Sequence, residues 1–469
     1  MFRILKHIFP LLLFFPIFFA CEKEEFNTSS DAHLIFSQDT ILFDTVFTTI
    51  GTATQRFTVK NPYNKNINLS SIYLAGGENS PYRLNIDGFP GKRLNDIELR
   101  AKDSLYIFVE VTIDPNNSDL PLVVQDSIVF SFNNTQQDIN LIAWGQDVNL
   151  INGEIIETET WTANKPYLIY NSMLVDSLCV LTIEPGAILH FHKNSRLYVA
   201  GTILADGTLE SPITFQGDRL EDDYDDIPGQ WDGIWLMAGS KNNIFNYSHI
   251  KNAIIGIQTD TLENIIQPTL SISNSIIENM TSAGIYAQGS SIKAYNTVVS
   301  NCGQFAIALT IGGSYEFYHC TIGNYWGFST RTTPSLLLNN YYFDDNGNIQ
   351  KRPINKALFG NCIIYGNKES EIYIDKDEYT LLSYKFDHSL IKVSDEFSVS
   401  DPNYFENVIV TDPGFVNPYN GNFELNESSD AVDEGKAAYG IMFPLDINMQ
   451  NRNADIAPDL GAFERVETP

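Results

Sequence analysis

The chain has 469 residues, which is enough for two or three domains, and its 43% hydrophobic and 12% aromatic content is too apolar for a disordered protein. It carries 29 Lys and Arg against 58 Asp and Glu, a formal net charge of −29 at pH 7. A surface this negative repels phosphate backbones, so nucleic acid is not an expected partner. Acidic surfaces suit the capture of divalent cations, although most of them are only solvated.

The first twenty residues predict an export signal. Two basic residues precede an almost unbroken apolar run over residues 8–19, which two prolines interrupt. The run is too short to span a bilayer, so residues 1–20 are interpreted as a signal peptide rather than an anchor.

Cys21 follows directly after this run. The sequence Phe18-Phe19-Ala20-Cys21 resembles the bacterial lipobox, although Phe18 and Phe19 replace the usual Leu and small residue. The next four residues, Glu-Lys-Glu-Glu, resemble the export signal of Bacteroidetes surface lipoproteins. The resemblance implies lipidation at Cys21, a location in the outer membrane facing the cell exterior, and a tether over residues 21–33.

Residues 34–148 predict a β-sandwich. Seven short segments, most of which alternate apolar and polar residues, are separated by Gly, Asn, Asp or Pro; they begin near Leu34, Ile41, Arg56, Ile67, Tyr106, Ser127 and Ile139. The stretches Phe57-Thr-Val-Lys-Asn-Pro and Ile107-Phe-Val-Glu-Val-Thr-Ile-Asp-Pro resemble immunoglobulin-like modules of bacterial surface proteins. No catalytic cluster stands out, so this domain is expected to be a spacer or adaptor.

A short motif recurs after residue 180. Its copies begin at Tyr247, Asn274, Asn296, His319, Asn361 and His388, with steps of 27, 22, 23, 42 and 27 residues. A fixed period of Ile/Val runs with Asn and Gly between them indicates one β-solenoid coil per repeat. The step of 42 requires an insertion, for which the polar stretch 330–356 is the candidate.

The motif also predicts which residues face inward. We expect Ile276, Val298 and Ile363 to stack into a common core, one above the other in successive coils. The final asparagines of the motif, Asn279, Asn301 and Asn324, are expected to occupy left-handed turns or to form amide ladders between coils.

The start and the end of this region resemble the right-handed parallel β-helix repeat proteins of Bacteroidetes. The resemblance rests on Thr182-Ile-Glu-Pro-Gly-Ala-Ile-Leu-His-Phe, Leu197-Tyr-Val-Ala-Gly-Thr and Asp459-Leu-Gly-Ala-Phe-Glu, among others. It implies an all-β chain with a β-helix over residues 149–410 and a closing segment over 411–469. It implies no single function, because the same fold carries lyases, hydrolases, epimerases, adhesins and scaffolds.

Four further cysteines, Cys179, Cys302, Cys320 and Cys362, lack the spacing of a metal site. They are expected to be small buried hydrophobic residues, and a disulfide between any two of them cannot be assigned from the sequence.

The densest acidic stretch runs from Glu221 to Asp226. Its four aspartates, Asp222, Asp223, Asp225 and Asp226, form a weak candidate site for Ca²⁺, which prefers oxygen ligands. The stretch lacks the alternating spacing and the glycine turn of a calcium loop, so a merely solvated loop is the alternative.

Aromatic residues crowd the central coils. Trp231, Trp235 and Trp326 are weak candidates for stacking on sugars, and the alternative is that they fill the solenoid core. No catalytic residues can be assigned, since the Gly-His-Gly and Arg-Ile-Lys motifs of pectinase-type hydrolases are absent.

Three functions remain open on the sequence. The first is a cell-envelope lipoprotein that presents a β-helix for glycan or partner binding without catalysis. The second is a polysaccharide lyase or glycoside hydrolase acting on an acidic polysaccharide, and the third is a spacer without a ligand. A Lys or Arg beside two or more carboxylates in a groove on the helix flank would favour the second.

Overall fold

The computed structural model describes residues 25–48, 54–114, 122–260, 268–344 and 346–465. The signal peptide and Cys21 lie outside the described residues. The chain divides into two compact units, one made of residues 1–114 and 122–145 and the other of residues 115–121 and 146–469. No helix in the described part of the chain is long and apolar enough to cross a membrane.

The first unit is a β-sandwich of two five-stranded antiparallel sheets around a single core. One sheet contains, in spatial order, β1 (Ile35–Phe36), β3 (Gln55–Lys60), β8 (Ser104–Val111), β5 (Tyr82–Ile86) and β6 (Phe89–Gly91). The other contains β2 (Thr40–Phe47), β10 (Thr135–Gln146), β9 (Leu122–Phe132), β4 (Ile67–Leu74) and β7 (Arg93–Leu99), and a short 3₁₀ helix, η1 (Gly77–Asn79), follows β4.

This confirms the predicted sandwich, with three strands that the sequence did not reveal. Strands β5, β6 and β7 lie within residues 82–99, where Gly, Pro and charged residues dilute the pattern. β7 is largely exposed, so it shows no apolar alternation. The resemblance of this unit to immunoglobulin-like modules stays a prediction.

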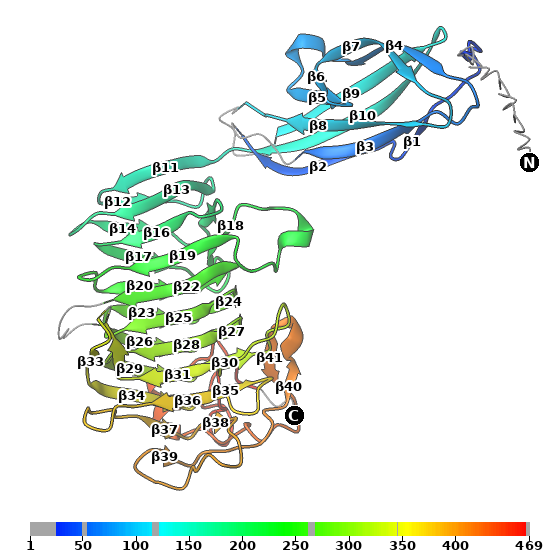
Figure 1. Cartoon of the computed structure of the whole chain (residues 1–469). Coiled ribbons are helices and arrows are strands. Elements are labelled where there is room, and N and C mark those ends of the chain that lie inside the picture. Colours follow the sequence, from blue (N-terminus) through cyan, green and yellow to red (C-terminus); the bar gives the residue numbers. More distant parts are fainter. Residues whose placement is uncertain (1–24, 49–53, 115–121, 261–267, 345, 466–469) are drawn as a thin grey trace, which may run out of the picture. The chain divides into compact units, whose positions relative to one another are not determined.

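The second unit is a parallel β-helix whose coils stack one upon another (Figure 1). Its first coil begins with β11 (Asn149–Ile156), which pairs in parallel with β13 (Tyr167–Val175) of the next coil. We name its three flat sides face A, face B and face C. Face A contains β16 (Arg196–Val199), β19 (Trp231–Leu236), β22 (Ala253–Asp260), β25 (Ala283–Gln288), β28 (Phe305–Thr310), β31 (Leu336–Asn339) and β36 (Ile372–Asp375).

Face B contains β15 (Ile188–Phe191), β18 (Ile213–Gly217), β21 (Ser248–Lys251), β24 (Ile276–Met280), β27 (Val298–Cys302), β30 (Thr321–Asn324), β35 (Ile363–Gly366) and β38 (Leu390–Ile391). Face C is a ten-stranded sheet of β12 (Glu159–Trp161), β14 (Val180–Ile183), β17 (Thr202–Asp206), β20 (Asn243–Asn246), β23 (Leu270–Ser273), β26 (Ser291–Tyr295), β29 (Gly313–Tyr318), β34 (Ile354–Gly360), β37 (Lys385–Asp387) and β39 (Phe405–Glu406). The predicted fold class, an all-β chain with a sandwich and a right-handed parallel β-helix, is thereby confirmed.

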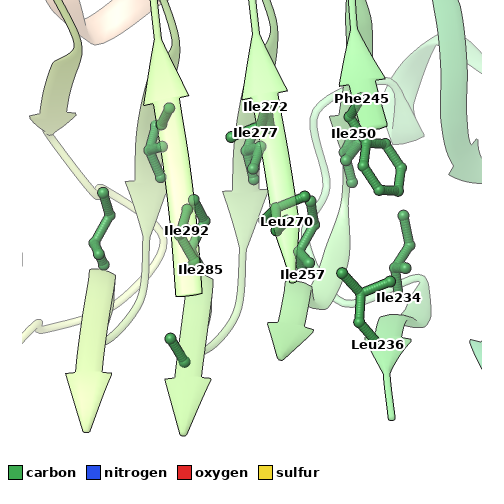
Figure 2. Packing of buried hydrophobic residues seen from close by; sticks show 14 of the residues in the cluster. Ile234, Leu236, Phe245, Ile250, Ile257, Leu270, Ile272, Ile277, Ile285 and Ile292 are labelled. Carbon is green, nitrogen blue, oxygen red and sulfur yellow. The ribbon is translucent and has the colours of Figure 1, made fainter. Parts of the chain in front are cut away.

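The core of the β-helix consists of aliphatic residues and several aromatic rings, and many of these side chains are stacked in register from coil to coil (Figure 2). On face B the stack passes through Ile250, Ile277, Val299, Ile322 and Ile364, each at most 1% exposed. Burial of such side chains contributes roughly 1.5–3 kcal/mol each. The regular stack therefore supplies much of the stability of this unit.

We predicted that Ile276, Val298 and Ile363 point into the core, and this prediction is wrong by one position along each strand. These side chains point out of the coil and pack in a second cluster with the C-terminal segment. Adjacent residues of a strand face opposite sides, so only one of the two apolar residues in each motif can enter the core. When two neighbouring residues are both apolar, the sequence does not show which of them points into the core.

The first residue of the motif forms a corner of each coil in the left-handed conformation. Tyr247, Asn274, Asn296, His319, Asn361, His388 and Asn407 all have φ between 44° and 52°. Amides of this corner bond from coil to coil: Asn296 Nδ2 donates to Asn274 Oδ1 at 3.0 Å, and Asn274 Nδ2 donates to Asn246 Oδ1 at 2.8 Å. Asparagine is favoured here because it tolerates positive φ and its amide reaches the next coil.

The amide ladder was expected at the final asparagines of the motif and lies at the first ones instead. Asn279 and Asn301 do adopt positive φ, of 60° and 48°, as expected for turn residues. Asn324 instead exchanges hydrogen bonds with the backbone of Cys302 in the preceding coil.

The step of 42 residues contains three regular strands of the β-helix, β30, β31 and β34, and a hairpin. The hairpin pairs β32 (Tyr341–Phe343) with β33 (Ile349–Lys351) in antiparallel fashion. The insertion is therefore narrower than the predicted 330–356, because part of that stretch belongs to the coil itself.

The closing segment folds back along face B (Figure 1). It contains β40 (Phe415–Asn417), the 3₁₀ helix η3 (Pro418–Asn420), β41 (Asn422–Leu425) and the single α-helix of the described chain, α1 (Ala437–Met442). Phe423 and Leu460 pack on the outward residues Val298 and Ile363. The ring of Phe423 approaches Gly323 so closely that a Cβ there would lie 2.3 Å from it. The segment thus covers the apolar outer surface of the late coils.

Candidate functional site

The acidic stretch forms a loop between β18 and β19 that borders a hollow of about 270 Å³ on face B. Asp222 and Asp223 lie in the short 3₁₀ helix η2 (Asp222–Tyr224), which protrudes from the coils (Figure 1). The hollow is lined by loop residues and by the strands beneath them, including Arg219, Tyr224 and Lys251. Arg219 lies flat over Tyr224, with 3.7 Å from its guanidinium carbon to the ring centre, and so fixes the loop.

The four predicted calcium ligands do not converge. Asp225 forms an ion pair of 2.7 Å with Lys251, and Asp226 accepts a hydrogen bond of 3.3 Å from Asn279. Within the described residues, the loop contains no group of three ligand atoms close enough to share a metal ion. Calcium binding by Asp222, Asp223, Asp225 and Asp226 therefore stays a prediction that this geometry does not support.

A lysine does lie among carboxylates beside this hollow. Besides Asp225, Lys251 acts electrostatically on Glu278, which also accepts a 2.6 Å hydrogen bond from His249. Burial acts to raise the pKa of Glu278, but the hydrogen bond and the charges of His249 and Lys251 outweigh it and lower that pKa. Glu278 is therefore a fixed carboxylate, not a proton donor at neutral pH.

The three tryptophans occupy different environments. Trp231 is 1% exposed and stacks on Phe191 with ring centres 4.1 Å apart, so its prediction as a ligand-stacking residue is wrong. Trp326 is 6% exposed and donates from Nε1 to Ser329 Oγ at 3.0 Å. Trp235 is partly exposed on the outer surface of face A.

A break in the alternation of β19 explains why Trp231 and Trp235 differ. Strict alternation would place residues 231, 233 and 235 on one side of the strand. Gly233, with φ of 110°, and Ile234 are both buried, so Trp231 points inward and Trp235 outward. At the same point the register against β22 shifts and skips Gly256. Within β19, the glycine is the sign of this break in the sequence.

Trp235 belongs to a row of aligned residues along face A. Successive parallel registers align one residue from each of nine strands, and we call this set the apolar row: Ile155, Leu174, Tyr198, Trp235, Gln258, Tyr286, Ala308, Leu337 and Tyr373. Ala308 is fully buried, so the row is accessible without a break over its first six members and again at its last two. Its end members Ile155 and Tyr373 are 65% and 54% exposed. Eight rung steps of ~4.8 Å give it a length of about 38 Å. Sequence reasoning missed the row because it can be recognised only once the coil register is known.

A second row runs beside it, two residues further along each strand. This polar row consists of Asp260, Gln288, Thr310, Asn339 and Asp375. Asp260 accepts a hydrogen bond of 2.8 Å from Trp235 Nε1, which holds the indole against the sheet. Asp375 accepts bonds from Asn339 and from the hydroxyl of Tyr341 in the hairpin. Face A therefore presents aromatic and amide groups side by side over several coils.

A second hollow, of about 280 Å³, lies in the closing segment and is lined by Glu424 and Glu464 among others. Burial raises the pKa of Glu464 to about 8, and the neighbouring Asp459 adds to this while Arg452 opposes it. Glu464 Oε2 accepts a 3.1 Å bond from Arg452, but Oε1 has no hydrogen-bond partner. A protonated carboxyl next to a hollow is a feature of general acids, although buried ionic networks produce it too.

One group of potential metal ligands exists in the described part of the chain: Asp387, His388 and Glu406. The ammonium group of Lys436 lies 2.8 Å from Asp387 and 3.6 Å from Glu406, and it already supplies the positive charge. Tyr439 in α1 also donates to Asp387 at 2.6 Å. The group thus connects the last coils to the closing segment and does not resemble an open metal site.

The four described cysteines are free thiols. Cys302, Cys320 and Cys362 are at most 1% exposed and lie within the core, as expected for small hydrophobic residues. Burial raises the pKa of the Cys302 thiol to about 12, so it is not a reactive nucleophile.

Comparison with solved structures finds only distant similarity. One is described as a family 123 glycoside hydrolase from Clostridium perfringens that hydrolyses glycolipid glycans; it has 9% identity and a TM-score of 0.19, over 26% of this chain and 26% of that one. Another is a protein of unknown function from Porphyromonas gingivalis W83, with 11% identity and a TM-score of 0.17, over 27% of this chain and 60% of that one. Both spans fall below two thirds of the other protein, and neither likeness supports an inference.

No curated protein matches this chain. A family model does: residues 264–410 match the family described as right handed beta helix region. This segment begins within the central coils and ends just before the closing segment, where the stacked parallel registers continue through face A and face B. The match to this family and the stacked parallel strands of the second unit agree on a right-handed parallel β-helix.

Proposed function

We propose that this protein is a lipid-anchored cell-envelope protein whose β-helix binds a glycan along face A without catalysis. The observation that carries the proposal is the apolar row, in which Tyr198, Trp235 and Tyr286 are held in register by the strands beneath them. Aromatic rings offer apolar faces to the C–H faces of sugars, and the polar row beside them offers hydrogen-bonding groups. The rigid coils fix both rows before any ligand arrives, which lowers the entropic cost of binding.

Catalysis is not part of this proposal, because the two rows do not place an acid and a base where either reaction requires them. The carboxylates of the polar row, Asp260 and Asp375, are bonded to Trp235, Asn339 and Tyr341. Hydrolysis of a glycoside requires an acid and a base on opposite sides of the bond, and elimination requires a base near a neutralised uronate. Neither arrangement occurs in the two rows.

The test is affinity gel electrophoresis of the full chain, purified in detergent, against a panel of neutral and acidic polysaccharides. Trp235→Ala is expected to weaken retardation at least tenfold, because it removes the largest ring of the row. Tyr106→Ala, which removes a 48% exposed aromatic residue of the first unit, serves as the matched control. Retardation that survives Trp235→Ala, or release of reducing or unsaturated ends, would contradict the proposal.

The location rests on the sequence around Cys21. Several acyl chains on one cysteine hold a protein durably to a membrane. Cys21→Ser is expected to abolish incorporation of alkyne-tagged palmitate and to release the protein from the membrane fraction of a Bacteroidetes host. Surface exposure is tested separately, by digesting intact cells with protease. An internal location of the labelled protein would refute the outward-facing part alone.

A second candidate function, glycoside hydrolysis in the hollow of the closing segment, is favoured by Glu464. Its raised pKa keeps a proton on the carboxyl at pH 7, and Glu424 lines the same hollow as a second carboxylate. If this function operates, the full chain releases reducing ends from one of the panel polysaccharides, and both Glu464→Gln and Glu424→Gln abolish the release. Absence of turnover on the whole panel excludes it.

A further inference from the structure

The charges along face A indicate which class of glycan it accepts. The polar row contains two carboxylates, Asp260 and Asp375, three uncharged side chains and no cation. Beside the apolar row, the guanidinium of Arg196 lies 5.7 Å from the Trp235 ring centre. Arg196 is itself 3.7 Å from the carboxylate of Asp232. The two rows thus offer no unneutralised positive charge to an anion.

An acidic polysaccharide would meet repulsion on this face. Each uronate or sulfate group lying along the rows would approach Asp260 or Asp375 without a compensating cation. The whole chain adds a net charge of −29, which disfavours the approach of a polyanion at low salt. A neutral sugar unit meets neither penalty, and its hydroxyl groups can donate to the carboxylates and bond to the amides of Gln288 and Asn339.

The shape of the site indicates how such a ligand lies. The two rows are parallel to the helix axis and repeat at every coil, since the strands are parallel and in register. A β-linked pyranose unit is about as long as one rung step of ~4.8 Å, so a linear chain can repeat the same contacts from coil to coil. A compact ligand would use only one or two of the six successive coils, from Ile155 to Tyr286, over which the row is accessible without a break.

We infer that face A binds an uncharged, linear polysaccharide lengthwise along the apolar row and that Asp260 and Asp375 exclude acidic polymers. The inference rests on the proposed function and gives it a substrate class. The acidic polysaccharide considered from the sequence is thereby replaced as the expected ligand of this face.

The experiment uses the full chain in detergent and pairs of polymers that share a backbone and differ in charge. The probes are hydroxyethyl cellulose with carboxymethyl cellulose, and dextran with dextran sulfate, in affinity gel electrophoresis at 20 and 200 mM NaCl. We expect a neutral polymer to bind at least tenfold more tightly than its acidic partner. Salt should change the neutral affinity less than twofold.

The double variant Asp260→Asn/Asp375→Asn tests the cause of the exclusion. Asparagine keeps an acceptor for the Trp235 indole and removes the charge, so the ratio of the acidic to the neutral affinity should rise several-fold. Asp138→Asn, an exposed carboxylate on β10 of the first unit, is the matched control and should change neither. Equal or tighter binding of the acidic polymers by the unmodified chain would overturn the inference and leave the proposed function intact.

Two other outcomes would overturn more than the preference for uncharged polymers. If no polymer of either kind is retarded, both the proposed function and the inference fail. If sedimentation shows a dimer that Trp235→Ala converts to a monomer, face A is an interface between copies and the ligand assignment is overturned.

Discussion

At the scale of single residues, the direction in which a side chain points from its strand decides whether it packs in the core or lies on the outer surface. Ile276 and Ile277 are adjacent and chemically identical, yet one packs under the closing segment and the other is fully buried inside the coil. The difference comes from the alternation of a strand that follows a left-handed corner at Asn274. A substitution of Ile276 therefore tests the packing under the closing segment, and a substitution of Ile277 tests the core of the coil.

This leads to a prediction about the two isoleucines. Ile277→Ala leaves a cavity in the closed coil and is expected to lower the free energy of unfolding by about 2–5 kcal/mol. Ile276→Ala, at a partly exposed site, should cost less than about half as much. Denaturant unfolding followed by circular dichroism measures both, and equal losses would contradict the assigned orientations.

A second prediction at this scale concerns pH. Burial lowers the pKa of His190 from 6.5 to about 4, against the opposing effects of the Gly217 carbonyl and Asp218. The fold therefore prefers the neutral ring, so this contribution to stability is complete above pH 6.5 and is lost as the pH falls towards 4. The loss amounts to about 3 kcal/mol over that range.

His190→Asn should remove this part of the pH dependence. The free energy of unfolding of the variant is expected to fall less than that of the unmodified chain between pH 7 and pH 4.5, measured by urea titration at each pH. His33→Asn, at an exposed histidine of the first unit, should leave the slope unchanged. The same slope in all three proteins would show that His190 is not the group responsible.

At the scale of elements, the hairpin β32–β33 interrupts the β-helix without belonging to its coils. Its flanking residues are already joined, because Arg352 N donates to Asn340 O at 3.0 Å. The side chains of Tyr342, Phe343 and Ile349 are exposed, so the hairpin contributes little to the core. It is joined to β36 and the residues after it by the bond from Tyr341 to Asp375 and by the ion pair of 2.7 Å between Lys351 and Asp377.

Replacing residues 341–351 by two glycines should therefore leave the fold intact. We expect the melting temperature to change by less than about 5 °C, since exposed elements contribute little to stability. Affinity for the retained polysaccharide should fall only if the ligand reaches the Tyr373 end of the row. Differential scanning calorimetry and affinity electrophoresis of one preparation measure both, and loss of cooperative unfolding would show that the hairpin supports the coils.

At the scale of the whole molecule, the two units have separate hydrophobic cores. The core of the sandwich contains only residues between Ala32 and Ala143, and the core of the β-helix contains only residues between Ile156 and Phe405. Each unit also has its own hydrogen-bonded sheets. Independent cores normally unfold independently.

Calorimetry of the full chain is therefore expected to show two transitions. Ile277→Ala should shift one of them, and Ile107→Ala, in the core of the sandwich, should shift only the other. A single transition that both variants shift together would show that the units unfold as one.

The sequence alone determined the class of structure. The repeat at 22–27 residues predicts stacked coils, and the alternating segments of residues 34–148 predict a sandwich, because both depend on local periodicity. It also placed apolar and asparagine residues at the right motif positions, although it assigned the inward residue and the amide ladder to the wrong members. Both errors concern the register, which determines which residue of a motif points inward and which one faces the next coil. The local sequence pattern does not determine this register.

Only the tertiary structure decided the candidate site. The break in alternation at Gly233 turns Trp231 inward and Trp235 outward, and a single glycine in the sequence does not show which side each ring faces. The apolar row joins residues that are 19 to 37 positions apart in the sequence and become neighbours only through the pairing of parallel strands. Periodicity specifies that coils form, whereas the side chains that share a surface are set by how each coil aligns with the next.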